Sequence, residues 1–386
     1  MSVSEAKPQS GEERIYWLAL ALTPTLGLVR ARRAAEHFDG AAAVFRASLT
    51  ELEAAGLPAA AAQSIFGGKS LAAAEEELVR AAAAGAEVLG YSDAPYPAIL
   101  KQIYDPPPVL YVRGDPAALA RPAVAIVGTR HPTPYGLGMA ERLAADLAAR
   151  GLVITSGLAR GVDAAAHRGA VAARGRTVAV LGTGIDVVYP RENKKLAEQL
   201  LALGGALVSE FAVGSFAAPQ NFPIRNRIIS GLALGVLVVE AGEYSGTRIT
   251  ARCALEQNRE LFAVPGNVTS KGSWGPNTLI KQGAKLTATW EDVWEELPTD
   301  IRLQLEPAAS ASEAPAAASL FGEAELPEHE RRVLALLKAD TATHIDELVE
   351  ALAGKVSSSE IFAALFELEL GGRIRQLPGK NYVKSF

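Results

Sequence analysis

Short apolar segments rich in β-branched residues alternate with helical patterns between residues 122 and 297, and this alternation limits the possible folds more than any other feature. It is typical of βαβ units, which build a parallel sheet covered by helices on both faces. Crossovers in such sheets are right-handed and lead to a doubly wound order. The sequence therefore predicts an α/β fold with a Rossmann-like, doubly wound parallel sheet. The expected strands cover 123–128, 152–157, 177–182, 206–210, 235–241 and 260–266.

Composition divides the 386 residues into further parts, as expected for a chain too long for one ordinary core. An alanine-rich stretch with a helical pattern comes first, and a proline-rich lead-in with one expected strand at 109–112 follows it. After the α/β part, the tract LEPAASASEAPAAAS cannot bury a core. The last segment has the order helix, helix, helix, hairpin, which is typical of a winged helix. The predicted domains are a helical SAM-like or helix-hairpin-helix-like domain at 11–85, an extended Rossmann-like domain with its lead-in at 86–300, a linker at 301–325 and a winged-helix domain at 326–386.

Charge is distributed unevenly along the chain. The formal net charge is −5, yet residues 121–289 contain 19 Lys and Arg against 11 Asp and Glu, a local balance of +8. The remainder of the chain must then carry −13. A basic middle part within an acidic protein indicates a domain that meets an anion.

Several protein classes are excluded by what the chain contains. The single cysteine, Cys253, excludes a disulfide framework and a CxxC metal site, and its apolar helical surroundings favour a small buried side chain over a nucleophile. The first residues lack the apolar core of a signal peptide. The longest apolar run, 228–239, is too short to span a bilayer. We therefore expect a soluble, cytoplasmic protein without membrane contact.

Polar and glycine-rich loops follow the predicted strands. In a parallel sheet these loops emerge at one edge, where open α/β sheets bind ligands. Glycines there allow close approach to the backbone, and helix N-termini offer free N–H groups. Four arginines add forks suited to phosphate, and no carboxylate lies within two residues of any of them. The residues expected at this edge are Thr129, Arg130, Ser156, Gly157, Arg160, Phe222, Arg225, Asn226, Arg227, Ser245 and Gly246.

The motifs narrow the choice of phosphate ligand. The dinucleotide fingerprint GxGxxG is absent from the first βα turn, which is GTRHPTPYG, and no Walker loop GxxxxGK[ST] occurs. NAD, FAD and ATP therefore have no specific support, and no cofactor or metal is expected. Phe222 and Tyr135 lie in the phosphate loops and could stack on bases, although Tyr135 is equally well explained as a packing residue. The favoured ligand is a nucleic acid.

Residues 96–286 resemble the DNA-processing protein A family, DprA or Smf. The shared phrases include PPPVLYVRG, AIVGTR, SGLARGVDAAAH, GTGIDVVYP, FPIRNRIISGLA, VVEAGEYSGTRITA and GPNTLIKQGA. The resemblance implies a homodimer that binds single-stranded DNA without sequence preference, protects incoming DNA in natural transformation and loads the RecA recombinase. Carried over by motif, it assigns DNA contacts to Arg130, Arg160, Phe222, Arg225, Asn226 and Arg227. Two departures are a loop that places Arg248 in an uncertain role and the absence of a basic residue just before Phe222.

An enzymatic alternative remains open at the sequence level. Asp163 and His167 are four residues apart on a helix and would share a face, but a carboxylate in a first helical turn also simply suits the helix dipole. Glu210, Glu240 and Glu243 lie at the same edge, where related phosphoribohydrolases use a helix glutamate. Their PGGxGTxxE phrase has only the counterpart EAGEYSGTRIT here. We therefore expect no catalytic residues and no enzyme, with a nucleotide-processing phosphoribohydrolase-like enzyme as the alternative.

The two flanking domains are predicted to play secondary roles. Arg30, Arg32 and Arg33 could help an N-terminal hairpin hold a phosphate, but the acidic segment favours a packing role.

The recognition helix of the winged helix, expected near 357–370, carries Glu360, Glu367 and Glu369 and no Lys or Arg. Such a helix repels a major groove, so a protein-contact or regulatory role is favoured over duplex recognition, although basic residues of the wing could touch a backbone.

Overall fold

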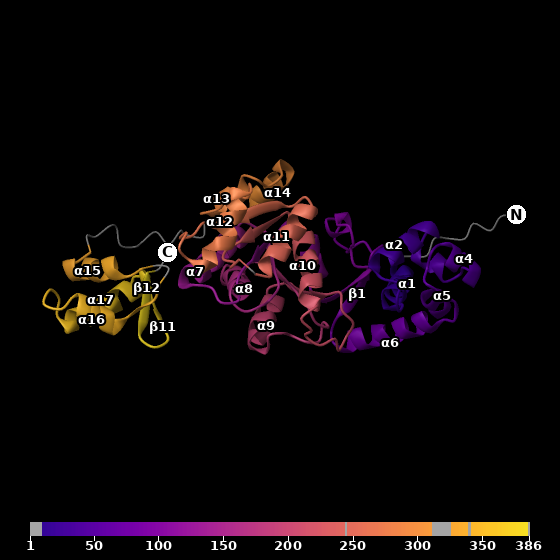
Figure 1. Ribbon diagram of the computed structural model, residues 1–386, viewed down its shortest axis with the longest axis horizontal. Coiled ribbons are helices and arrows are strands. Elements are labelled where there is room, and N and C mark those ends of the chain that lie inside the picture. Colours follow the sequence, from indigo (N-terminus) through magenta and orange to yellow (C-terminus); the bar gives the residue numbers. More distant parts are fainter. Residues whose placement is uncertain (1–9, 244, 311–325, 339–340, 385–386) are drawn as a thin grey trace.

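The computed structural model describes residues 10–243, 245–310, 326–338 and 341–384. Three parts follow one another along the long axis of the molecule: N-terminal helices, a central α/β domain and a small C-terminal domain (Figure 1). The central domain supplies the sheet edge on which the sequence places its candidate site.

The central sheet has the strand order β1-β2-β6-β5-β4-β3-β7-β8-β9. All neighbours from β6 to β9 pair in parallel, which confirms the predicted Rossmann-like parallel sheet. Two strands of the lead-in, β1 and β2, extend the sheet beyond β6 with antiparallel pairing. The expected strand at 109–112 is part of β2, whereas β1 was not foreseen. The strands are β1 Glu87–Gly90, β2 Val109–Gly114, β3 Ala123–Val127, β4 Val153–Ser156, β5 Thr177–Val180, β6 Ala206–Ser209, β7 Gly235–Val238, β8 Glu260–Ala263 and β9 Lys285–Leu286.

The order of the strands reverses at β3. Strands β4, β5 and β6 follow on one side of β3, whereas β7, β8 and β9 follow on the other. The loops that leave β3 and β7 therefore lead to opposite faces of the sheet. A crevice opens between such loops at the carboxyl ends of the strands, and this is where open α/β sheets bind ligands.

Helices cover both faces of the sheet because the side chains of each strand alternate between two cores. Val124 and Ile126 of β3 pack with α7 and α8, whereas Ala125 and Val127 face the core that contains residues of α10 and α11. Both faces are apolar, as expected for buried parallel strands. The helices of the central domain are α7 Pro134–Ala149, α8 Val162–Ala172, α9 Lys194–Ala202, α10 Asn221–Gly231, α11 Thr247–Glu256, α12 Trp274–Lys281 and α13 Trp290–Trp294, with short 3-10 turns η1 Leu100–Gln102, η2 Pro116–Ala120, η3 Arg191–Asn193 and η4 Lys271–Ser273.

The N-terminal helices share a hydrophobic core with the central sheet. Trp17 and Leu18 are buried in the same cluster as Val88 of β1 and Tyr111 of β2. Arg14 also donates to the buried Asp93 carboxylate of the lead-in over 2.8 Å. The helical segment is thereby fixed to the sheet edge formed by β1 and β2. Its helices are α1 Ser10–Leu22, α2 Leu28–His37, α3 Ala41–Val44, α4 Leu49–Ala54, α5 Ala59–Phe66 and α6 Lys69–Ala83.

The linker predicted at 301–325 is wrong for its first part. Helix α14, Thr299–Ser310, continues from the central domain into this range. Leu305 is buried in a core with Val293 and Leu297, so the apolar spacing of this stretch outweighs its alanine and proline content. Residues 311–325 lie outside the described part of the chain.

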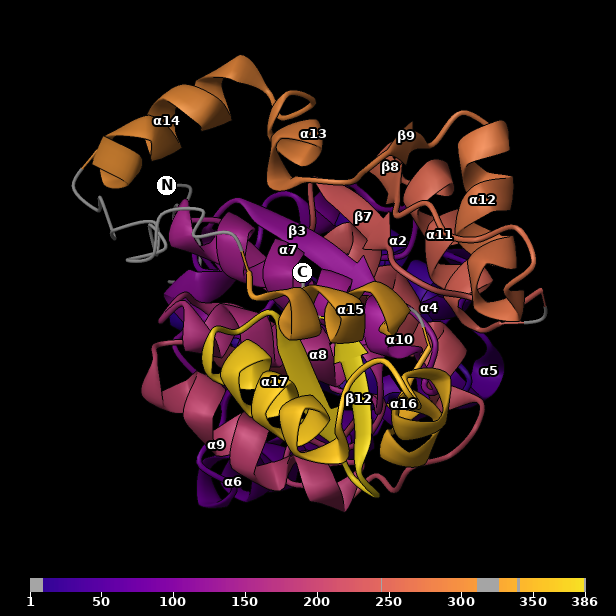
Figure 2. The ribbon, with the colours of Figure 1, turned by 90° about the vertical axis from the view of Figure 1, so that its left-hand side faces the viewer.

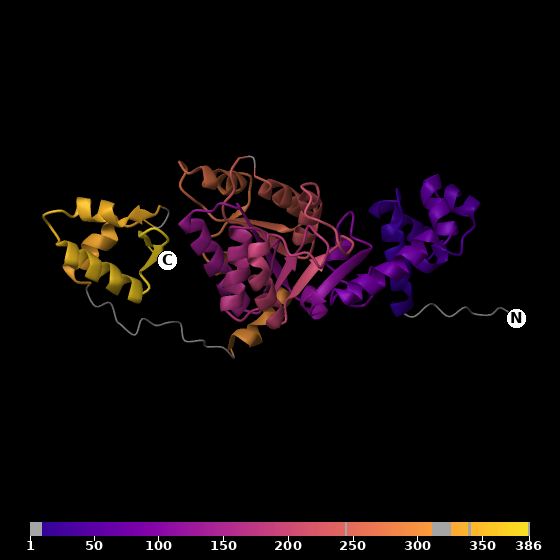
Figure 3. The same ribbon diagram turned by 90° about the horizontal axis from the view of Figure 1, so that it is seen from below.

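The C-terminal domain forms the predicted winged helix. A three-stranded sheet with the order β10-β12-β11 packs with three helices around Val333, Ile361 and Leu365. The hairpin strands β11 and β12 lie on the side nearer the central domain, and helices α16 and α17 lie farther out (Figures 1 and 3). Its elements are α15 Glu328–Leu336, β10 Thr343–His344, α16 Ile345–Ala351, α17 Ser358–Leu370, β11 Ile374–Leu377 and β12 Asn381–Lys384.

Candidate nucleic-acid interface

A cavity of about 740 Å³ opens where the strand order reverses. Its walls come from the loop after β3, the start of α10 and the loop between β7 and α11. A smaller hollow adjoins it and shares the Arg130, Tyr189 and Phe222 walls. The main cavity is lined by seven of the residues predicted from the sequence, Thr129, Arg130, Phe222, Arg225, Asn226, Ser245 and Gly246, and the smaller hollow adds Gly157 and Arg160.

Arg225 forms the buried floor of the cavity. Only 4% of its surface is exposed, and its Nη1 donates to the carbonyl oxygens of Gly157, at 2.7 Å, and Val180. Burial lowers the pKa of Arg225 to about 10, which leaves the guanidinium charged at neutral pH. The nearby Asp163 opposes that shift. Arg225 therefore supplies fixed positive charge beneath the cavity, and two carbonyl groups already hold part of its fork.

Two glycines are required by the close packing beneath the cavity. A Cβ at Gly157 would lie 2.2 Å from Nη1 of Arg225, and one at Gly182 would lie 2.9 Å from the Phe222 ring. Neither contact is possible for a side chain without moving its neighbour. The glycines that follow β4 and β5 thus allow Arg225 and Phe222 to reach the sheet edge.

Arg130 is the exposed cation of the cavity. It is the third residue after β3, and its Cζ lies 5.4 Å from the centroid of the Phe222 ring. Tyr189, which is 43% exposed, has its ring 5.8 Å from the same Phe222 ring. An exposed guanidinium beside two aromatic rings can bind a phosphate while the rings offer stacking surfaces for bases.

Arg160 is also exposed at the mouth of the smaller hollow, but a carboxylate holds it. Its Nε and Nη2 donate to the two carboxylate oxygens of Glu192, each over 2.8 Å. The side chains of Arg160 and Glu192 are 55% and 53% exposed. The sequence has no carboxylate within two residues of Arg160, which suggested an unpaired guanidinium. The guanidinium is nevertheless paired, because Glu192 is 32 residues away in the sequence and is brought to it by the fold.

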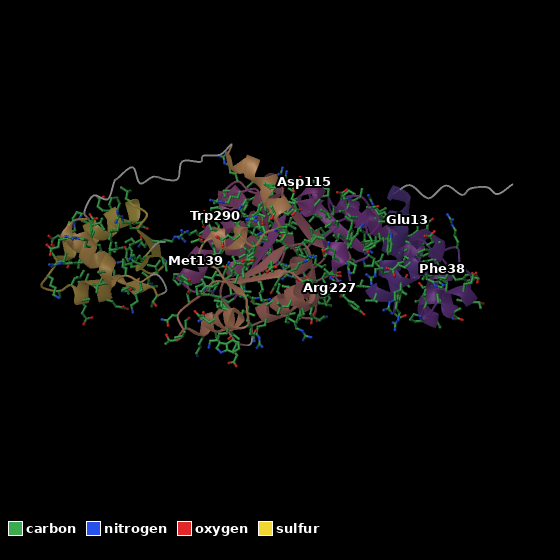
Figure 4. The ribbon with its side chains drawn as sticks, turned by 90° about the horizontal axis from the view of Figure 1, so that it is seen from above. Glu13, Phe38, Asp115, Met139, Arg227 and Trp290 are labelled. Atoms are coloured by element: carbon green, nitrogen blue, oxygen red, sulfur yellow. The ribbon has the colours of Figure 1, made fainter. Side chains whose placement is uncertain are left out.

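Ser156 and Arg227 do not reach the cavity, which corrects their predicted place at the open edge. Ser156 is fully buried at the end of β4. Its hydroxyl donates to the carbonyl of Ile126 on the adjacent strand β3 over 2.6 Å, so it is not available at the cavity. Arg227 is buried on another side of α10, toward the N-terminal helices (Figure 4). There it pairs with Asp105 and Glu210 at 2.9 and 2.6 Å.

The loops at the cavity are fixed by backbone and carboxylate contacts. The amide of Thr129 donates to the Glu240 carbonyl over 2.7 Å, and this bond joins the loops after β3 and β7. The buried Glu240 carboxylate accepts from the amide and hydroxyl of Thr133, the residue that caps α7. Glu240 therefore holds a helix start in place, which is a structural use of a residue considered for catalysis.

Asp163 and His167 likewise have separate structural partners. The Asp163 carboxylate accepts from the Gly157 amide, and burial raises the pKa of Asp163 while Arg225 opposes this. Nδ1 of His167 lies 2.7 Å from the Thr177 hydroxyl, which itself donates to the Ile154 carbonyl, so Nδ1 carries the proton. Burial lowers the pKa of His167 to about 3 and keeps the ring neutral.

Three further residues have structural surroundings. The Tyr135 hydroxyl donates to the Pro265 carbonyl over 2.7 Å, in keeping with the packing alternative. Arg248 donates to the Glu243 carbonyl and lies 5.6 Å from the Trp274 ring, outside the cavity lining. Cys253 is half-buried, and burial raises the pKa of its thiol, which disfavours a nucleophilic thiolate.

Sequence reasoning missed Tyr189 and Glu192. Both belong to the GTGIDVVYP phrase and the turn that follows it, and they are brought to the mouth by the loop after β5. The family resemblance includes this phrase but assigns no DNA contact to Tyr189 or to Glu192. Among the described residues, no three His, Cys, Asp or Glu side chains gather as a metal site. No helix in the described ranges is both long and apolar enough to cross a membrane.

Comparison with known proteins places this architecture in a family. The family model "DNA recombination-mediator protein A" matches residues 87–298, more than half of the chain. The chain belongs to the DprA/Smf family. A second model, the DprA winged helix domain, matches residues 308–380. The family resemblance of the sequence and the predicted combination of Rossmann-like and winged-helix domains are thereby confirmed.

Individual relatives agree with this assignment. Protein Smf of Synechocystis is 33% identical over 398 residues, covering 97% of this chain and 99% of that protein. Protein Smf of Escherichia coli is 42% identical over 289 residues and covers 75% of each chain. The X-ray structure of DprA from Streptococcus pneumoniae has a TM-score of 0.64 at 33% identity, covering 76% of this chain and 99% of that one.

Proposed function

We propose that this DprA/Smf protein binds single-stranded DNA without sequence preference in the cavity at the strand reversal. The observation that carries the proposal is the exposed Arg130 beside the Phe222 ring, above the buried charge of Arg225. Proteins hold single strands without reading their sequence in two ways. Cations bind the phosphates, and aromatic side chains stack on any base.

The proposed DNA contacts remain those at the open edge. Arg130 and Arg160 bind phosphates, Phe222 stacks on a base, and Arg225 acts as a fixed charge beneath the strand. Thr129, Asn226, Ser245 and Gly246 line the same cavity and offer further hydrogen-bonding groups. Gly157 contributes by leaving room for the Arg225 guanidinium. Ser156 and Arg227 do not contact DNA and instead stabilise the domain through their buried partners.

We propose binding without catalysis and without a cofactor or metal. Asp163, His167 and Glu240 are each engaged in contacts that position loops or helices. In the family's terms, the protein would form a homodimer in the cytoplasm, protect incoming DNA during natural transformation and load RecA. The family description as a recombination mediator supports this role.

Fluorescence anisotropy of a labelled oligothymidine across a salt series tests the proposal. Arg130→Gln should weaken binding and lower the slope of log K against log salt by about 0.7, the value for one phosphate contact on a single strand. The matched control is Arg142→Gln, which removes the same charge from an exposed part of α7 outside the cavity. It should leave both quantities unchanged.

Two results would contradict the proposal. Equal losses in the Arg130 and Arg142 variants would show that only net charge matters and that the cavity is not the site. Tight binding of a nucleoside monophosphate with little salt dependence, and with release of free base, would instead establish the nucleotide-processing alternative.

A further inference from the structure

Helix α17 of the winged-helix domain carries two apolar faces. Ile361, Leu365 and Leu368 lie in the core of the domain and account for its packing. Phe362 and Phe366 are nevertheless 56% and 63% exposed on another side of the helix.

The exposed apolar residues form a continuous stripe. Phe362, Phe366 and Leu370 follow one another at intervals of four residues, so they lie on one face of α17, and Leu370 is 74% exposed. Single exposed apolar residues are common on protein surfaces, but a row of large ones marks an interaction site. We refer to these three residues as the α17 stripe.

The charges around the α17 stripe exclude a nucleic acid as its ligand. Helix α17 contains Glu360, Glu367 and Glu369 and no Lys or Arg. A phosphate backbone is repelled by such a surface. Basic residues of the domain lie on other elements: Arg331 and Arg332 on α15, Lys355 in the segment before α17, and others on the wing. On the wing, Arg375 comes within 3.7 Å of Glu141 on α7 of the central domain.

The position of α17 leaves the stripe open to a partner. In the end-on view the helices of the winged-helix domain lie in front of the central domain, and β11 and β12 are on the side closer to it (Figures 1 and 2). The contact between the wing and α7 therefore leaves α17 uncovered, which agrees with the large exposed fractions of the stripe.

The same charges decide between the possible occupants. A second copy of α17 would bring two rows of glutamates together, which is unfavourable. The segment 311–325 contains Glu313, Glu323 and Glu325 and no Lys or Arg, so its charge would be repelled as well. An apolar stripe flanked by acids is complementary to an amphipathic helix whose apolar face is flanked by Lys or Arg.

We propose that the α17 stripe is a docking surface for a basic amphipathic helix of a partner protein. The winged-helix domain thereby serves as a protein-recruiting module, and its recognition helix contacts protein where a duplex reader would contact bases. Apolar contact with Phe362 and Phe366 provides affinity, and Glu367 selects for positive charge. This inference does not depend on single-stranded DNA binding by the central cavity.

The test uses the full chain and a labelled synthetic peptide of about 20 residues, long enough to form a helix, with leucines at helical spacing and flanking lysines. A second peptide has glutamates in place of the lysines. The full chain should bind the basic peptide with salt-sensitive affinity and should bind the acidic peptide at least tenfold more weakly. Phe362→Ser/Phe366→Ser should weaken binding of the basic peptide at least tenfold, and Glu367→Lys should also weaken it.

The control is Phe66→Ser, which removes a phenylalanine that is 62% exposed on the N-terminal domain. It should leave peptide binding unchanged, while thermal unfolding of all variants shows that they remain folded. Equal binding of the two peptides, or binding insensitive to the α17 changes, would overturn the proposal. Sedimentation that showed a dimer lost in Phe362→Ser/Phe366→Ser would also overturn it, because the occupant would then be a second copy.

Discussion

The ion pair between Arg160 and Glu192 leads to a prediction about affinity. Glu192 accepts two hydrogen bonds of 2.8 Å from the Arg160 fork, the arrangement that a phosphate would require. Asn193, the next residue, is buried and donates to the Leu158 carbonyl over 2.9 Å. The turn that carries Glu192 is thus anchored to the loop that carries Arg160, so the carboxylate competes with DNA for this cation.

The expected change in DNA affinity follows from the solvent exposure of the Arg160 and Glu192 side chains. Both side chains are more than half exposed, and solvent screens such pairs. Measured exposed pairs correspond to a bias of at most about fivefold in an equilibrium. Glu192→Gln should therefore tighten oligothymidine binding about two- to fivefold. The salt slope should steepen by up to about 0.7, because the carboxylate no longer competes with the phosphate contact of Arg160.

The assay is the same anisotropy salt series, with Glu198→Gln as the matched control. Glu198 is an exposed glutamate on α9, so its change alters net charge equally without touching Arg160. Adding Arg160→Ala to the E192Q protein should remove the gain in affinity. An equal gain in the Glu198 variant, or no gain from Glu192→Gln, would refute the competition between carboxylate and phosphate. If the unmodified protein did not bind oligothymidine at all, the proposed function itself would be refuted.

Three further predictions concern the buried and stacking groups. Arg225→Met should lower the free energy of unfolding of the central domain by about 1–3 kcal/mol in urea titrations, because the buried carbonyl groups of Gly157 and Val180 lose their donor. A loss below about 1 kcal/mol would contradict this role. Phe222→Ala should weaken oligothymidine binding by about 1–3 kcal/mol, because a stacking surface is lost. Phe222→Tyr should retain the affinity of the unmodified protein, because tyrosine also offers an aromatic face. Equal losses of affinity in both variants would argue against stacking. Burial lowers the pKa of His167 to about 3, well below its value in the unfolded chain, about 6.5. Between these two pH values the unfolded chain binds one proton more than the folded chain. The free energy of unfolding therefore falls as the pH decreases through this range, by up to about 1.4 kcal/mol per pH unit. His167→Gln should flatten this pH dependence in thermal unfolding, while an unchanged slope would show that His167 is not responsible.

Local patterns predicted the fold well because they record burial on one or both faces. The apolar segments that became β3 to β8 are buried on both sides of the sheet, and no polar alternation was needed to recognise them. Patterns failed where packing between distant segments decides the outcome. Helix α14 packs Leu305 into the central domain, and its composition alone did not predict this.

The sequence by itself determined which residue types gather at the carboxyl edge of the sheet, because parallel strands place their following loops together whatever the details. It could not separate Arg130, which is exposed, from Arg225, which is buried beneath the same cavity. It also could not show that Arg227 pairs with Asp105 and Glu210. The tertiary structure alone decided these roles, since the ionic partner and the solvent exposure of a side chain depend on residues far away in the sequence.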